Sequence, residues 1–517
     1  MKSRIRLIYG LLLLVLWARV FAGESSIAQL QAQQASGQLT AEQLTSAYLT
    51  RIAELDKAGP KLNAVIELNP DALAIARQLD EERRAGHVRG PLHGIPILLK
   101  DNIATADRME TTAGSLALVG ERPPADAPVV QQLRAAGAVI LGKTNLSEWA
   151  NFRGDKSVSG WSGRGGQTHH PYALDRNPSG SSAGSAVAVA ADLCAVAVGT
   201  ETNGSIISPS SICGVVGFKP TVGLVSRTGI IPISITQDTA GPIARTVADA
   251  AALLEGMAAV DARDTATRLR PAGLRTDFTH QLTPGALQGA RLGVLHGPFG
   301  FDERLDPLLG QAVAALQAAG AVIVDLGEHP ELRKASASES DVLLYEFKDG
   351  LNAYLATLGP AAPVKTLTDL IAFNQAHAPD ELRIFGQELL IAAEAKGTLS
   401  DEAYRRARAD CLQYSRKEGI DALLDQHHLD ALVCLSRGPA SLIDPVNGDG
   451  FTGGSSSLPA IAGYPNITVP AGYFRSLPVG LSFYGTAWTD GRILALAADY
   501  EEHTHLRIPP AFAPTVP

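Results

Sequence analysis

The chain is poor in the residues that build metal centres. It has only four cysteines among its 517 residues, and no two of them form a C-x-x-C pair. Metal sites in proteins use closely spaced thiolate and imidazole ligands, so the wide spacing of Cys194, Cys213, Cys411 and Cys434 argues against one. The sequence H-E-x-x-H is also absent, which excludes a zinc protease of that class. Cys194 and Cys434 stand in apolar runs, as small core residues do.

Positive charge is scarce and scattered. The 44 lysines and arginines are outnumbered by 53 aspartates and glutamates, which gives a formal net charge of −9. A protein that binds nucleic acid through its bulk charge has the opposite balance. Basic pairs such as Arg83-Arg84 and Arg405-Arg406 lie in mixed-charge, helix-like surroundings, which is typical of solvated helix faces. We therefore expect no nucleic-acid partner.

Long apolar runs are missing too, apart from one at the N-terminus. Residues 7–18 are mostly apolar and follow three basic residues, and Val20 and Ala22 place branched and small residues at positions −3 and −1 of a cleavage site. This is the layout of a secretory signal peptide cleaved after Ala22, and a membrane anchor is the alternative. A membrane span needs about 20 apolar residues, and no other stretch approaches that length. We predict a signal peptide at 1–22 and an exported, soluble protein over 23–517, periplasmic in a Gram-negative cell.

The rest of the chain alternates between helical and strand-like patterns. Residues 25–56 repeat apolar residues every three or four positions, and Thr40 begins a T-A-E-Q segment that resembles a capping box. The run GPLHGIPILLKDN has an apolar centre bounded by turn residues, which predicts a buried strand ending at Lys100. A helix then leads to a second strand at 138–141. This alternation predicts an α/β fold whose mixed sheet is covered by helices on both faces.

Further elements follow the same pattern. Residues 302–444 read as mainly helical and more charged, and we expect them to form a variable region or lid that shapes the substrate site. We predict a single large domain and a monomer. The other predicted segments are a buried helix at 183–192, a strand at 195–199, a helix at 245–261, a strand at 290–297, strands and turns at 458–472 and 477–485 that close the sheet, and a helix at 491–504.

Two short motifs point to unrelated chemistry. Residues 137–144 match the P-loop pattern, but a P-loop needs a turn where this sequence has the strand-like A-V-I-L. Residues 180–184 match the G-x-S-x-G elbow, which would make Ser182 the nucleophile of a Ser-His esterase. The upstream residues are polar and broken by proline rather than strand-like. His427 and His428, the available bases, lie in a charged helical context typical of a solvated face.

A serine and lysine chemistry of another kind is also compatible with the sequence. Lys100 ends an apolar strand, and burial would lower its pKa and make it a general base near neutral pH. A strand-end lysine that reaches solvent beside Asp101 is the alternative, and Lys143 has an equivalent placement. Ser205 follows a strand and a Thr-Asn-Gly turn, whose backbone N–H groups can stabilise an oxyanion.

Several long segments together resemble the amidase signature family. They read GPLHGIPILLKDNI, GAVILGKTNLSEWA, NPSGSSAGSAVAVAADLCAVAVGTETNGSIISPSSICGVVGFKPTVGLVSRTGIIP and QDTAGPIARTVADAAALL, in this order. PNITVPAG and LPVGLSFYG are similar to the family's C-terminal segment, so the resemblance covers about residues 25–500. It implies an α/β fold with a mixed central sheet between helical layers. It also implies hydrolysis of carboxamides by a Ser–Ser–Lys triad, a chemistry that needs no metal or organic cofactor.

Carried over position by position, the resemblance assigns roles to individual residues. Lys100 becomes the base and Ser205 the nucleophile, and Ser181 becomes the bridging serine, whose peptide bond is cis in the family. Ser182 beside it is then structural. The implied donors to the oxyanion are the backbone N–H groups of Thr202, Asn203, Gly204 and Ser205.

The sequence departs from the family pattern at two places. The common T-G-G-S turn is T-N-G-S here, and we expect Asn203 to take the place of glycine because asparagine tolerates positive φ. Ile207 and Ser208 stand where members acting on glutamine or small acidic amides tend to have arginine, which favours a neutral or larger amide. Within the family, the chain is most similar to bacterial peptide amidases. A general amidase for other neutral amides, the amidotransferase subunit and a non-catalytic protein of the same fold are the alternatives.

Overall fold

The computed structural model describes residues 24–297, 300, 302–360 and 362–516. The predicted signal peptide, residues 1–22, lies outside the described residues. Within them, no helix combines the length and apolar character that crossing a membrane requires.

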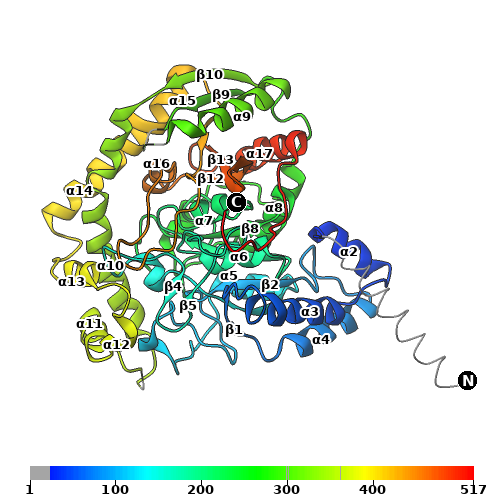
Figure 1. Cartoon of the computed structure of the whole chain (residues 1–517), viewed down its shortest axis with the longest axis vertical. Coiled ribbons are helices and arrows are strands. Elements are labelled where there is room, and N and C mark those ends of the chain that lie inside the picture. Colours follow the sequence, from blue (N-terminus) through cyan, green and yellow to red (C-terminus); the bar gives the residue numbers. More distant parts are fainter. Residues whose placement is uncertain (1–23, 298–299, 301, 361, 517) are drawn as a thin grey trace, which may run out of the picture.

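In the described part of the chain, eleven strands form one mixed sheet (Figure 1). Strands β2, β3 and β6 are parallel neighbours, and β6 pairs with β8 in the antiparallel sense. In spatial order the strands are β1 (Val65–Leu68), β3 (Val139–Thr144), β2 (Pro96–Lys100), β6 (Val196–Glu201), β8 (Thr239–Ala244), β7 (Val216–Lys219), β12 (Asn466–Phe474), β13 (Leu477–Tyr484), β11 (Ala431–Leu435), β9 (Arg291–Leu295) and β10 (Val322–Gly327). A small separate hairpin joins β4 (Trp161–Ser162) and β5 (Gly166–Gln167).

Helices flank this sheet. Every residue of β2, β3 and β6 is buried, so both faces of the sheet are covered at its centre. This confirms the predicted α/β fold. The helices are α2 (Ile27–Ala35), α3 (Ala41–Arg51), α4 (Ala72–Arg84), α5 (Pro128–Ala135), α6 (Ala183–Ala190), α7 (Ile207–Ile212), α8 (Val247–Met257), α9 (Asp306–Ala318), α10 (Glu339–Ala356), α11 (Leu367–Ala376), α12 (Ala378–Glu381), α13 (Glu388–Glu394), α14 (Glu402–Leu412), the π-helical η8 (Gln413–Ile420), α15 (Asp421–His427), α16 (Ser457–Ala462) and α17 (Asp490–Thr504).

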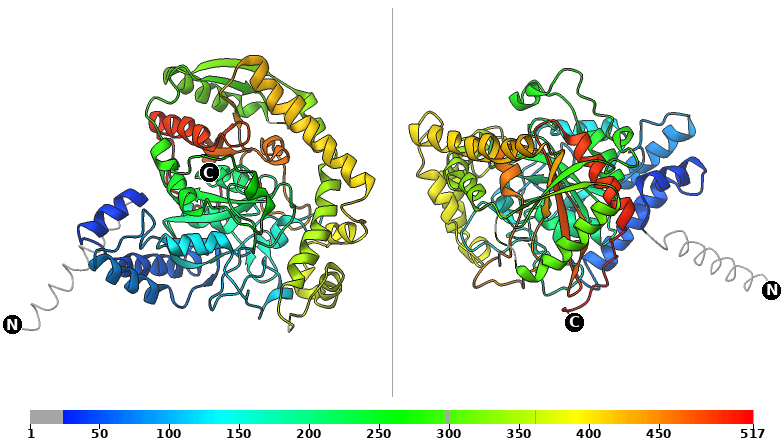
Figure 2. Two further views of the ribbon diagram at one scale, coloured as in Figure 1. Left: turned by 180° about the vertical axis from the view of Figure 1, so that it is seen from behind. Right: turned by 90° about the horizontal axis from the view of Figure 1, so that it is seen from above.

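The segment between β10 and β11 supplies one side of the molecule. Helices α10 to α14 lie along this side, opposite the side on which α2 to α4 lie (Figures 1 and 2). The strands that precede and follow these helices both belong to the main sheet. Residues 302–444 therefore include two sheet strands as well as helices, and the region is continuous with the rest of the fold.

Several local predictions are confirmed at the level of single residues. Thr40 accepts a hydrogen bond from the Gln43 N–H, and the Gln43 side chain accepts from the Thr40 N–H, so the predicted capping box is present. Strand β2 ends at Lys100 as expected. Strand β3 is longer than predicted, because it continues through the buried Lys143 to Thr144.

Other predictions are wrong in ways that have a physical cause. Residues 458–472 begin with helix α16 rather than a strand, and Gly463 ends that helix in the left-handed conformation, with φ 72°. Strands β12 and β13 lie inside the sheet and do not close it, since β1 and β10 form its edges. Strand β8 was not predicted, because its sequence TAGPIA carries a glycine and a proline that usually mark turns.

Candidate active site

Lys100 lies at the carboxyl end of β2, where the strand carries its side chain into the interior. The residue is fully buried. Its Nζ donates hydrogen bonds to Ser181 Oγ at 2.7 Å, to Thr200 Oγ1 at 2.8 Å and to the Thr200 carbonyl at 3.2 Å. Thr200 belongs to β6, the parallel neighbour of β2, so the sheet itself fixes the position of the amine.

The surroundings of Lys100 favour its neutral form. Burial lowers the pKa of Lys100 to about 7, and the charges of Asp238 and Glu201 oppose that shift. A lysine with this pKa exchanges a proton near neutral pH, which is the property that a general base requires. Asp238 is partly buried, and desolvation raises its pKa to about 6.

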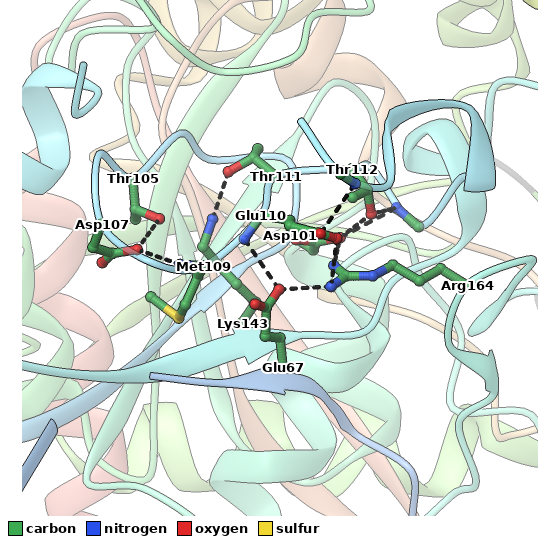
Figure 3. Close-up of polar contacts among 12 residues, drawn as sticks. Glu67, Asp101, Thr105, Asp107, Met109, Glu110, Thr111, Thr112, Lys143 and Arg164 are labelled. Atoms are coloured by element: carbon green, nitrogen blue, oxygen red, sulfur yellow. Dashed lines mark hydrogen bonds and ion pairs between the residues drawn. The ribbon is translucent and has the colours of Figure 1, made fainter. Parts of the chain in front are cut away.

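Lys143, the alternative base, belongs to a different cluster (Figure 3). Its Nζ donates to the Ile103 carbonyl and to Thr111 Oγ1, both at 2.7 Å. Burial lowers its pKa to about 8, and the neighbouring Asp101 opposes the shift. Arg164 also contacts Asp101 in this cluster, at 3.4 Å. Among the described residues no serine hydroxyl is hydrogen-bonded to Lys143, so the structure pairs Lys100 and not Lys143 with a serine.

Ser181 lies in the loop before α6 and is fully buried. The Gly180–Ser181 peptide bond is cis, as the family resemblance implies. The Ser181 carbonyl accepts a hydrogen bond from the Ser147 N–H at 3.1 Å. A Cβ atom at position 180 would lie 2.1 Å from Ser147 Oγ, so any residue but glycine there would have to displace the Ser147 hydroxyl.

Ser182 holds the neighbouring loops together. Its hydroxyl donates to the Thr200 carbonyl at 3.0 Å and accepts from the Thr200 N–H at 3.1 Å. Its own N–H donates to the Ser205 carbonyl at 3.0 Å. The elbow alternative has no support in this geometry, because His427 and His428 lie at the end of α15 and neither is hydrogen-bonded to Ser182 in the described structure.

Ser205 follows β6 and the turn of residues 202–204, immediately before α7. The residue is 7% exposed. Within the described residues, its hydroxyl makes no hydrogen bond. The N–H groups of Thr202, Asn203 and Ser205 likewise have no acceptor there, which leaves them available to an anion. Burial raises the pKa of the Glu201 carboxylate, and the N–H of Gly204 is one of the groups that partly offset that rise.

The conformation of the turn corrects the expectation for Asn203. The positive φ of 81° falls on Gly204, and Asn203 is not among the residues with positive φ. Asparagine is therefore not needed for a left-handed backbone. Its side-chain amide instead donates to Glu339 Oε1 at 2.9 Å, and its side-chain carbonyl accepts from Ser456 Oγ at 2.8 Å.

Glu339, in the first turn of α10, connects the helical side of the molecule to the turn. It is buried, and its Oε1 also accepts from Gln237 Nε2 at 2.9 Å. Gln237 in turn donates to the Thr202 carbonyl at 3.2 Å. Two side chains thus link Glu339 to the turn that precedes Ser205. No local pattern predicts this contact, because Glu339 and Asn203 are 136 positions apart.

Glu201 is a further residue that sequence reasoning missed. It is 1% exposed, and its Oε2 accepts from the N–H groups of Ile206 at 2.7 Å and Ile207 at 2.9 Å. These are the first backbone groups after Ser205, so the carboxylate fixes the turn from its other end. Burial raises the pKa of Glu201, and the positive charge of Lys219 opposes the shift. The sequence feature that could have identified Glu201 is its place in the run GTETNGS, directly after an apolar strand.

A large cavity opens beside these groups. Its volume is ≈1110 Å³, and Asn102, Thr200, Thr202 and Asp238 line one part of it. The loop of residues 227–236 and helix α10 supply much of the remaining wall. Among the described residues, no group of three His, Cys, Asp or Glu side chains is arranged to hold a metal ion. All four cysteines are unpaired and buried.

Residues 43–494 match the amidase family model. The chain therefore belongs to the amidase family, and it is an amide-hydrolysing C–N hydrolase.

The most informative similarities are to three individual proteins. The chain is similar to the native peptide amidase from Stenotrophomonas maltophilia, with 55% identity, a TM-score of 0.91, and 95% of this chain and 99% of that chain covered. An amidase family protein from Bacillus anthracis shares 37% identity at a TM-score of 0.86, with 96% and 94% covered. A probable amidase of Arabidopsis thaliana is 40% identical over 501 residues, covering 95% of this chain and 92% of the relative.

The lowered pKa of Lys100 predicts how activity depends on pH. If neutral Lys100 is the base, kcat/KM falls about tenfold for each unit below pH 7 and levels off above it. Asp238→Asn removes a charge that raises the pKa of Lys100, so its acid limb moves to lower pH. The measurement is kcat/KM for a neutral amide between pH 5 and 9 in both proteins. A flat profile, or an acid limb that the substitution leaves in place, would contradict the assignment of Lys100.

The pairing of Asn203 with Glu339 predicts the outcome of an exchange of amide and carboxylate. Asn203→Asp places two carboxylates against each other, which displaces the turn and lowers kcat by roughly 10- to 100-fold. Adding Glu339→Gln restores a carboxylate–amide pair and recovers most of that loss, since the new amide at 339 can still accept from Gln237.

The control for this exchange is Glu339→Gln alone, which keeps an acceptor for Asn203 and has the smaller effect. Steady-state kcat and KM are measured for all three variants. A double variant no more active than Asn203→Asp alone would contradict the coupling.

Proposed function

We propose that this protein is an exported peptide amidase, which removes the C-terminal amide from peptides and releases ammonia. The observation that carries the proposal is the hydrogen bond between the buried Lys100 amine and Ser181, next to the turn that presents Ser205. The similarity to the peptide amidase of Stenotrophomonas maltophilia supports this choice of substrate. A general amidase acting on other neutral carboxamides is the second candidate, supported by the Arabidopsis relative.

In the proposed mechanism, protons move along the line from Ser205 to Lys100. Neutral Lys100 accepts a proton from Ser181, which takes the proton of Ser205 as the Ser205 oxygen attacks the amide carbonyl carbon. The free N–H groups of the turn stabilise the negative charge that develops on the carbonyl oxygen. Ser181 then protonates the amide nitrogen, the C–N bond breaks, and ammonia leaves an ester on Ser205.

The second half of the reaction reverses these roles. Water attacks the ester carbonyl while Ser181 and Lys100 take its proton. The Ser205 oxygen recovers its proton as it leaves, which releases the peptide with a free carboxylate and restores the enzyme. The reaction consumes one water and uses no metal or organic cofactor.

The proposal predicts a specific pattern of ammonia release. We expect release from peptide amides, weaker release from free amino-acid amides, and little from fatty amides. Ser205→Ala lowers this activity by roughly 10⁴-fold or more, because the acyl-enzyme cannot form, and leaves the circular dichroism spectrum unchanged. Ser182→Ala serves as the neighbouring comparison. Substantial turnover by the folded Ser205→Ala protein, or equal rates on all three amide classes, would contradict the proposal.

Export is part of the same proposal. The basic residues and the apolar run of 7–18 predict cleavage after Ala22, so the mature chain begins at Gly23. N-terminal mass spectrometry of protein recovered from the periplasm of an expressing Gram-negative cell measures this directly. A mature protein that retains residues 1–22 would instead indicate an anchored form.

A further inference from the structure

The cavity that Thr200 and Thr202 border is lined in part by charged side chains, and most of these have partners in the described structure. Arg227 is held by Asp264 in a bidentate ion pair, with distances of 2.9 and 2.6 Å. Arg263 pairs with Asp261 at 3.1 Å. These cations are neutralised by Asp264 and Asp261, so neither is left for a ligand.

The carboxylates of the same wall are similarly engaged. Asp126 pairs with Arg134 at 2.9 Å. Asp238 accepts from Thr202 Oγ1 and from the N–H groups of Ile233 and Ser234. Among the described carboxylates that line the cavity, only Asp349, which is exposed on α10, makes neither a hydrogen bond nor an ion pair.

Arg408 is the exception among the cations. It lines the cavity from α14 and has neither a hydrogen bond nor an ion pair in the described structure. Its Nη1 is buried without a partner. The nearest carboxylate that acts on it is Glu346, but Glu346 already accepts from Ser234, Thr236 and Tyr404. Glu346 is thus saturated by hydroxyl donors and is not ion-paired with Arg408.

Arg416 adds a second positive charge to the same wall. It lies on η8, which continues α14, and also lines the cavity. Its Nε donates to the Ala462 carbonyl at 2.8 Å, and its guanidinium lies 5.1 Å from the centre of the Tyr464 ring. Neither contact neutralises its charge. Burial lowers the pKa of Arg408. The charge of Glu346 opposes this shift and that of Arg416 adds to it.

The proposed reaction limits what these cations can meet. In the proposed function ammonia is the whole leaving group, so the cavity of ≈1110 Å³ bordered by Thr200 and Thr202 is the space for the acyl side of the substrate, which is the peptide itself. A peptide amide has no C-terminal carboxylate. An anionic group that reaches Arg408 from such a substrate is therefore an aspartate or glutamate side chain.

We propose that Arg408 and Arg416 form a subsite for a carboxylate side chain of the peptide, so that the enzyme prefers peptide amides with an acidic residue upstream of the amidated position. This inference rests on the proposed function. It also differs from the expectation drawn from Ile207 and Ser208. Those positions concern a carboxylate close to the reacting amide, whereas the Arg408 subsite lies on the wall formed by α10 and α14.

The test uses N-acetylated tripeptide amides that differ only in having Glu or Gln at one position. The Glu or Gln is placed at each upstream position in turn. At one of these positions, we expect the kcat/KM of the wild-type enzyme to be roughly tenfold higher for the Glu peptide than for the Gln peptide. Arg408→Met keeps the aliphatic stem and abolishes this ratio, while kcat/KM for the Gln peptide stays within about twofold. The matched control is Arg405→Met on the exposed face of the same helix, which retains the wild-type ratio.

Salt dependence gives a second measurement on the unmodified enzyme. The Glu-to-Gln ratio falls as NaCl rises from 0.05 to 0.5 M, because added ions screen the attraction. A wild-type ratio of one at every position, or a ratio that survives Arg408→Met, overturns the subsite. If neither the Glu nor the Gln peptides are hydrolysed, the proposed function fails instead. The two failures are therefore distinguishable.

Discussion

The burial of one amine constrains most of the structure around it. Lys100 reaches the interior because β2 is covered on both faces, and in that position a charged ammonium is costly. Three hydrogen-bond partners from Ser181 and Thr200 hold the amine in place, and its pKa falls to about 7. Because Thr200 also fixes Ser182, and Ser182 fixes Ser205, the strand β6 aligns every group that the proposed mechanism uses. A displacement of β6 would therefore disturb base, relay and nucleophile together.

Local sequence was sufficient for the elements and residues that the chain places close together along its length. The strand ending at Lys100, the capping box at Thr40 and the helix after Ser182 were all predictable, because periodicity and capping act over a few residues. The position of Ser205 after its turn followed from the same local pattern. The α/β class and the family were accessible for the same reason, since the long run from 177 to 232 is itself largely local.

What the sequence could not supply depends on contacts between distant segments. Periodicity does not show which of two buried strand lysines faces a serine. The structure shows that Lys143 donates to the Ile103 carbonyl instead. Likewise, Glu339 contacts Asn203 across 136 positions, and only the structure shows that Arg408 has no ion pair because Glu346 accepts from other donors. The predicted position of β12 and β13 in the sheet was wrong for the same reason, because no local sequence pattern shows that these strands lie inside the sheet.

The bond between Asn203 and Glu339 has a consequence for how such an enzyme can diversify. Helix α10 forms part of the cavity wall and also holds the turn in front of Ser205. Selection for a new substrate that reshapes α10 acts on catalytic alignment at the same time. Grafting the α10–α14 segment from a relative would thus transfer its substrate preference only if the residue at position 203 were replaced at the same time. Changes in α10 therefore affect substrate specificity and turnover together.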